Sequence, residues 1–322
     1  MGARALRGES GYPRSVTRRS PLAAALAATL AACSTTGTPP PETSPTPTST
    51  ALPTTSPTGT TPPLADGGTA PDGAAPPTDG GPSGNVVGLG GIAAWNALSA
   101  AEKAKVTTTP SLFLHQSVGQ DLEDGVETLG LSYRTYRAPV GAGLNGQIFR
   151  SFGVDNGNPT QKTARWQSES TRTENAQLAV TVMKYGYADV TPALLATAKT
   201  AYTNAVTAIK AAGKKVVHVT PPLVFDTAEN PAKIQFREWM LQTFQGDVIY
   251  DLQDVESTHP TTGARCEVGG VWRICQEIRS TRACLSPQSG PQGDDDSQGH
   301  ICPVQGTRIA PSFLYALYLA AR

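Results

Sequence analysis

The chain has 322 residues, and its 26 basic side chains balance its 26 acidic side chains to a net charge of zero. No basic stripe runs through the part that can fold, which argues against nucleic acid as a partner. The length would allow two domains, but a long segment with almost nothing to bury leaves room for one domain of ordinary size.

The first 33 residues have the pattern of an export signal. Several arginines precede the apolar run PLAAALAATLAAC, which is too short to span a bilayer. LAAC, at 30–33, resembles the lipobox of bacterial lipoproteins, so we expect residue Cys33 to be lipidated, with an ordinary signal peptide as the alternative. The paired arginines in TRRSPLA leave the choice between the general and the twin-arginine export route open.

Residues 34–85 form the next segment, and they are dominated by Thr, Pro, Ser and Gly. Such a composition buries too little apolar surface to offset the entropy of ordering, so the segment is expected to be an extended, disordered tether. The folded domain should therefore comprise residues 86–322.

Strand and helix patterns alternate through that domain. SLFLH, at 111–115, reads as a strand, and the helical spacing after it ends at Gly130. A long helix is expected from Thr191 as cap and Pro192 as first residue, closed by Gly213. Further strands are expected in LSYRTYRA, AQLAVTVMKY, KKVVHVT and DVIYDL, and further helices in PAKIQFREWMLQTF and, interrupted near Pro311, in TRIAPSFLYALYLAA.

This alternation predicts an α/β fold, a doubly wound parallel sheet in a three-layer α/β/α sandwich. Ligands of such sheets bind beyond the carboxyl ends of the strands. Ser117 lies at that place, after the first strand and at the start of a helix, where backbone N–H groups are unpaired. It is either the helix cap or a nucleophile.

Cysteine positions indicate an oxidising compartment. The four cysteines other than Cys33 all lie in the last quarter of the chain. They allow two disulfides in three possible pairings. Zinc is the competing interpretation, but no close C-x-x-C pair is present, and we expect no metal. The four residues are Cys266, Cys275, Cys284 and Cys302.

A nucleophilic serine needs a histidine as general base and an acid that orients it. His300 stands just after three aspartates and before the last helix, whereas His218 lies in a predicted buried strand and His259 in a polar loop. Ser117, Asp296 and His300 are therefore the candidates for a catalytic triad.

With these residues the chain resembles the SGNH (GDSL-like) hydrolases, esterases on a flavodoxin-like sheet, and most closely a bacterial branch with HQSVG around the serine. HQSVG stands at 115–119, and GLNG, MKYGYAD, VTPPL, YDLQDVEST and GHICPVQGTRIA follow in the order of that branch. The resemblance implies Ser117 as nucleophile and His300 as base. It also implies an oxyanion site with three donors: the Ser117 N–H, the N–H of either Gly143 or Gly146, and the side chain of Asn145.

The chain departs from the family pattern at two positions. Ala188 stands where many relatives have the asparagine of G-x-N-D, and Ser297 stands three residues before His300, where the acid is usual. Asp296 is expected to replace that acid. Tyr187 and Asp189 are expected at the pocket, as is His115, which can also simply pack beside the strand.

The sequence therefore predicts a monomeric, exported, lipid-anchored serine esterase without cofactor. Its substrate would be an acetyl or short acyl ester on a small molecule or a polysaccharide, including carbohydrate of the envelope, and the membrane would be contacted through the lipid alone. Ala188 and Ser297 favour an alternative, a catalytically inactive binding or scaffold lipoprotein on the same fold. An acyltransferase with the same triad is not distinguished from a hydrolase by sequence.

Overall fold

The computed structural model describes residues 85–130, 134–135, 147–288 and 299–322. The export signal and the tether up to residue 84, with Cys33, lie outside the described residues, as do Gly143, Asn145, Gly146 and Asp296.

Seven strands form one sheet in the order β1-β7-β6-β5-β2-β4-β3, and every neighbouring pair is parallel. Without the two-residue edge strands, this is the strand order of flavodoxin-like sheets, as predicted. The strands are β1 (Val86–Val87), β2 (Ser111–His115), β3 (Arg134–Thr135), β4 (Gln147–Ser151), β5 (Val180–Met183), β6 (Lys215–Val219) and β7 (Val248–Tyr250).

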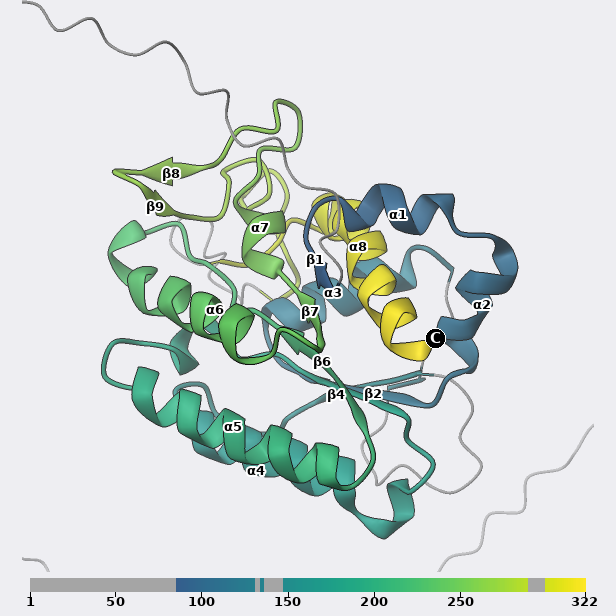
Figure 1. Cartoon of the computed structure of the whole chain (residues 1–322). Coiled ribbons are helices and arrows are strands. Elements are labelled where there is room, and N and C mark those ends of the chain that lie inside the picture. Colours follow the sequence, from purple (N-terminus) through teal and green to yellow (C-terminus); the bar gives the residue numbers. More distant parts are fainter. Residues whose placement is uncertain (1–84, 131–133, 136–146, 289–298) are drawn as a thin grey trace, which may run out of the picture. The chain divides into compact units, whose positions relative to one another are not determined.

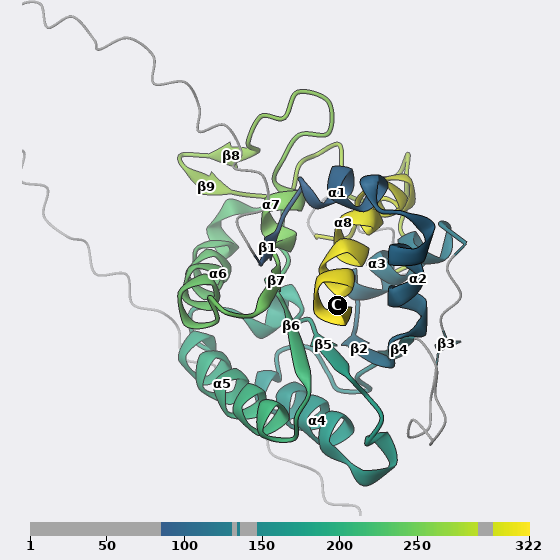
Figure 2. The same cartoon turned by 45° about the vertical axis from the view of Figure 1, so that its right-hand side comes forward.

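Helices cover both faces of the sheet, which gives the expected three layers. Figures 1 and 2 show α4, α5 and α6 on one face and α1, α2, α3 and α8 on the other. The helices are α1 (Gly91–Ala97), α2 (Ala100–Thr108), α3 (Val118–Glu127), α4 (Pro159–Thr171), α5 (Leu195–Ala211), α6 (Pro231–Thr243), α7 (Leu252–Glu256) and α8 (Pro303–Ala321). A separate antiparallel hairpin joins β8 (Glu267–Val268) to β9 (Val271–Trp272).

The core has two halves, one on each side of the sheet. Along β2, Leu112 and Leu114 point into the half covered by α4, α5 and α6, while Phe113 points into the half covered by α3 and α8. This alternation follows from the two-residue period of a strand. Because both faces are covered, all five residues of β2 are buried.

Two helix boundaries differ from the prediction. Thr191 does not cap α5; its carbonyl accepts from the Leu194 N–H in a tight turn, and the helix starts one turn later at Leu195. Helix α8 is not interrupted at Pro311 but runs unbroken from Pro303 to Ala321. Its apolar side chains are buried against the sheet, and this packing outweighs the roughly 3 kcal/mol cost of an internal proline.

The sheet reverses its winding direction at β2. From β2 the chain passes to β4 on one side and then to β5 on the other. This topological switch point is where ligands bind in open parallel sheets, beyond the carboxyl ends of the strands. Ser117 follows β2 at this point.

Candidate active site

Ser117 has an unusual backbone. Its φ of 58° and ψ of −123° make it the one residue other than glycine with positive φ in the described part of the chain. Such a conformation costs on the order of 1–3 kcal/mol and is typical of sharp strand-to-helix turns that present a nucleophile. The serine takes the cap position of α3, but its side chain makes no cap hydrogen bond.

Gly119 makes this turn possible. A Cβ at Gly119 would lie 2.3 Å from the Cβ of His115 and 3.0 Å from the Cε of Lys184. The first turn of α3 therefore sits directly on the end of β2, and any side chain at this position would push the helix away. The glycine of HQSVG is explained by this close approach.

The hydroxyl of Ser117 meets a histidine from the far end of the chain. Ser117 Oγ lies 3.1 Å from Nε2 of His300. His300 is 5% exposed, and its backbone is fixed because its carbonyl accepts from the Ser280 N–H at 2.7 Å. Two residues later Cys302 forms a disulfide with Cys284, so the histidine is held between a backbone bridge and a covalent link.

Asp121 completes the arrangement. Its Oδ2 lies 2.9 Å from His300 Nδ1 and also accepts from the Ile301 N–H at 3.0 Å, while the Ser286 hydroxyl donates to its Oδ1. With Nδ1–H directed at this carboxylate, Nε2 of His300 is free to accept the proton of the Ser117 hydroxyl. Serine, histidine and aspartate thus have the geometry of a catalytic triad.

Asp121 was not among the residues that the sequence predicted. It follows Ser117 by four residues and lies in the first turn of α3, which starts directly after the serine. The expected acid, Asp296, lies outside the described residues. Asp296 is the acid nearest to His300 in sequence, whereas Asp121 is separated from His300 by 179 residues.

No family model matches this chain, and no curated protein matches it.

Two backbone donors stand beside the serine hydroxyl. Within the described part of the chain, no acceptor pairs with the N–H groups of Ser117 and Val118 at the start of α3. Helix N-termini leave such groups unpaired, and they can hold a developing oxyanion. The predicted donors from Gly143, Asn145 and Gly146 belong to a segment that is not described.

The three predicted pocket residues occupy different positions. Tyr187 faces the site, with its ring edge-on to His300 at 6.3 Å between ring centroids. His115 is buried beneath α3 with Nε2 2.7 Å from Glu123 Oε2, and burial lowers the pKa of His115. His115 therefore supports the helix from below.

Asp189 is buried and ties two loops together. Its carboxylate accepts from the Gly186 N–H in its own loop and from the Gly157 N–H in the loop after β4, and it forms an ion pair with Lys162 at 2.6 Å. Lys162 also donates to Asn156 Oδ1 at 2.9 Å. Asp189 thus fixes the loop that carries Tyr187 instead of facing the serine.

Buried charges lie behind the triad. Burial lowers the pKa of Lys184 to about 8 and raises the pKa of Glu256 to about 8. Glu256 Oε2 accepts from the Leu223 N–H at 2.8 Å, and the Leu223 carbonyl packs so tightly on Gly299 that a Cβ there would come within 2.1 Å of its oxygen. Glu256 therefore supports the loop against which the residue before His300 rests.

The four late cysteines are paired as Cys266–Cys275 and Cys284–Cys302. Cys266 and Cys275 lie near Glu277, but their sulfurs are bonded to one another and are not thiolate ligands for a metal. Two disulfides indicate an oxidising, extracytoplasmic location. Among the described helices, none combines the length and apolar character needed to cross a bilayer.

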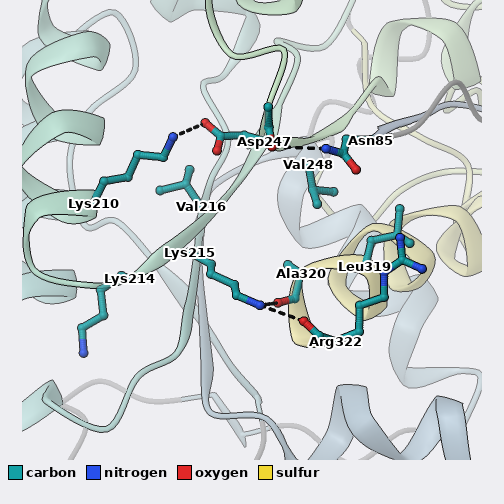
Figure 3. A pocket seen from close by; sticks show the side chains of 11 residues that line it. Asn85, Lys210, Lys214, Lys215, Val216, Asp247, Val248, Leu319, Ala320 and Arg322 are labelled. Carbon is teal, nitrogen blue, oxygen red and sulfur yellow. Dashed lines mark hydrogen bonds and ion pairs between the residues drawn. The ribbon is translucent and has the colours of Figure 1, made fainter.

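A cavity of about 380 Å³ lies at the opposite edge of the sheet, where β6 and β7 begin (Figure 3). Its lysines are engaged by the chain itself: Lys210 pairs with Asp247 at 2.6 Å, and Lys215 donates to the carbonyls of Ala320 and Arg322. The cavity lies between α5, β6, β7 and α8, and Ser117, His300 and Asp121 are not among the residues that line it.

Proposed function

We propose that this chain is a serine ester hydrolase of the SGNH type. The observation that carries the proposal is the hydrogen-bonded series Ser117, His300 and Asp121 at the topological switch point of the sheet. The positive φ of Ser117 supports it, because a serine that only capped α3 would need neither the strained turn nor a histidine at its hydroxyl.

The reaction follows from the positions of these groups. Ser117 Oγ attacks the acyl carbon while His300 Nε2 takes the hydroxyl proton, and the N–H groups of Ser117 and Val118 hold the oxyanion. The ester bond breaks, and the alcohol leaves with the proton from His300. Water then attacks the acyl-enzyme, gives a proton to His300 and releases the carboxylic acid, and Ser117 recovers its proton.

Asp121 keeps the imidazole in the required tautomer and stabilises it when it is charged. Its own position is secured by the Ile301 N–H and the Ser286 hydroxyl. Gly143, Asn145 and Gly146 stay predictions for the remaining oxyanion donors, and Asp296 stays a prediction for the acid.

The protein would act at the cell surface. The lipobox-like LAAC indicates a lipid anchor at Cys33. Residues 34–85 would then act as a tether that lets the domain reach polymer around the cell. An acetyl or short acyl ester on envelope or extracellular carbohydrate is the substrate class that suits this placement.

A binding or scaffold protein on the same fold is the second candidate. Ala188 favours it, because this residue lies in the loop of Tyr187 and offers no side-chain donor where related esterases have asparagine. The two candidates differ in whether Ser117 is reactive.

Labelling with a fluorophosphonate probe tests this reactivity. We expect the full-length protein, purified in detergent with its disulfides intact, to be labelled, and Ser117→Ala and His300→Ala to lose the label. Ser99→Ala is the matched control, because Ser99 does cap its helix through a side-chain hydrogen bond and should leave labelling unchanged. An unlabelled wild-type protein, or a labelled Ser117→Ala variant, would make the binding protein the better conclusion.

A further inference from the structure

Four arginines lie over two aromatic rings near the carboxyl edge of the sheet. Arg237 and Arg265 lie over the ring of Trp272, with guanidinium carbons 4.8 and 4.0 Å from its centroid. Arg273 and Arg279 lie over the ring of Phe225 at 4.1 and 4.0 Å. Stacking on an aromatic face fixes a guanidinium in place without using its hydrogen-bond donors.

The charges over Trp272 are neutralised by carboxylates. Arg237 forms an ion pair with Asp251 at 2.5 Å, and Arg265 forms one with Asp254 at 2.7 Å. These two arginines therefore hold the hairpin β8–β9 against the domain, and their role is structural.

Arg273 differs from them. It is half-buried, no carboxylate of the described chain lies within ion-pair distance of it, and its buried Nε donates to no described acceptor. Asp226, next to Phe225, directs its carboxylate to the Ala228 N–H instead. Its guanidinium charge is therefore left for a ligand that brings a negative group.

The surroundings of Arg273 are rigid. It directly follows β9 in the sequence, and its N–H donates to the carbonyl of Cys266 at 3.0 Å. It also lies inside the short loop closed by the Cys266–Cys275 disulfide. The guanidinium is therefore held in position before any ligand binds, which reduces the entropy lost on binding.

Both partners of this stack are attached to the segments that hold His300. Phe225 follows Leu223, whose carbonyl packs on Gly299, and two residues span at most about 7 Å. Arg279 precedes Ser280, whose N–H donates to the His300 carbonyl. The stack is thus joined through short stretches of chain to the backbone on both sides of His300.

We propose that Arg273, on the ring of Phe225, binds an anionic group, a carboxylate or a phosphate, on the alcohol part of the ester substrate. The planar guanidinium matches both groups through paired charge-assisted hydrogen bonds. The inference rests on the proposed esterase activity and narrows its substrates to esters of acidic molecules, such as acylated uronic acid sugars.

Binding is measured first, on a protein that cannot turn over. The full-length Ser117→Ala variant is titrated by calorimetry with methyl glucuronoside, methyl glucoside 6-phosphate and neutral methyl glucoside. We expect one of the anionic sugars to bind at least tenfold more tightly than the neutral sugar, and Ser117→Ala/Arg273→Ala to lose this preference. The two anionic sugars distinguish a carboxylate site from a phosphate site.

Turnover is measured next, with the acetylated forms of the same three sugars. Arg273→Ala should lower kcat/KM on the preferred anionic ester at least tenfold and leave the neutral ester within twofold, while Arg273→Lys retains part of the preference. Arg172→Ala removes an arginine beyond the end of α4, at the other edge of the sheet, and should change neither value.

Each outcome decides the proposal. Equal binding of charged and neutral sugars, or a preference that survives Arg273→Ala, overturns the anion site. If charge-dependent binding is lost with Arg273 but no ester is hydrolysed and no probe reacts, the anion site stands and the esterase assignment fails.

Discussion

At the scale of single residues, the acid that orients His300 is the sharpest question. Asp121 contacts His300 Nδ1 at 2.9 Å and is itself held by two donors, whereas Asp296 was chosen for its closeness to the histidine in sequence. An acid in the first turn of α3 is held close to Ser117, so in the proposed mechanism the nucleophile and the group that orients its base come from one short segment.

Asp121→Asn should therefore lower kcat roughly 10³-fold to 10⁴-fold while the protein stays folded, because the amide no longer selects the tautomer that accepts from serine. Acetate release from an activated ester measures the effect. Asp124→Asn is the matched control, since Asp124 lies on the same helix and bonds to Gln120. If Asp296→Asn has the large effect and Asp121→Asn a small one, the acid is Asp296.

At the scale of elements, the packing of α3 on α8 aligns the triad. Helix α3 starts directly after Ser117 and carries Asp121, and α8 begins three residues after His300. The two helices approach most closely at a pair of glycines, because a Cβ on Gly125 would lie 2.4 Å from the carbonyl oxygen of Gly306. The distance between these helices therefore affects the distance between Ser117 and His300.

Gly125→Ala should push the two helices apart. We expect a loss of about 1–3 kcal/mol in the free energy of unfolding and at least a tenfold fall in kcat, because small displacements of reacting groups are costly. Chemical denaturation and ester hydrolysis measure the two effects. Gly246→Ala, at a glycine with open space around it, should change neither. Full activity in Gly125→Ala would show that the helix contact does not set the catalytic geometry.

The same elements show how far sequence alone could lead. The strand 111–115, the helix after it and the parallel sheet were predicted from the spacing of apolar residues. This spacing can be read from neighbouring positions in the sequence, because each element must bury its own apolar side chains. Helix α8 was predicted to break at Pro311, since the packing that keeps it intact comes from distant parts of the chain. Asp121 was missed for the same reason: its partner His300 is 179 residues away.

At the scale of the whole molecule, stability depends on two ionisable side chains that are buried near Ser117 and His300. Glu256 and Lys184 are both fully buried behind the site, and each has its pKa shifted toward the neutral form, chiefly by burial. Both groups change protonation on unfolding, so the stability of the domain depends on pH.

The two residues act in different pH windows. The Glu256 pKa, about 8 in the folded protein, is above its ordinary 4.5, so its stabilising contribution is complete below pH 4.5 and is lost as pH rises toward 8. The Lys184 pKa, about 8, is below its ordinary 10.5. Its effect is a rise in stability between pH 8 and 10.5, with no slope below that range.

Glu256→Gln should therefore flatten the pH dependence between pH 5 and 8. Glutamine resembles the protonated acid, so the wild-type protein should lose stability relative to the variant as pH rises, on the order of 1 kcal/mol per pH unit. Urea unfolding at pH 5, 6, 7 and 8 measures the difference. Glu127→Gln, which removes an exposed acid from α3, should run parallel to wild type. Parallel curves for Glu256→Gln and wild type would mean that Glu256 is ionised in the folded protein across this range, with its charge balanced by Lys184.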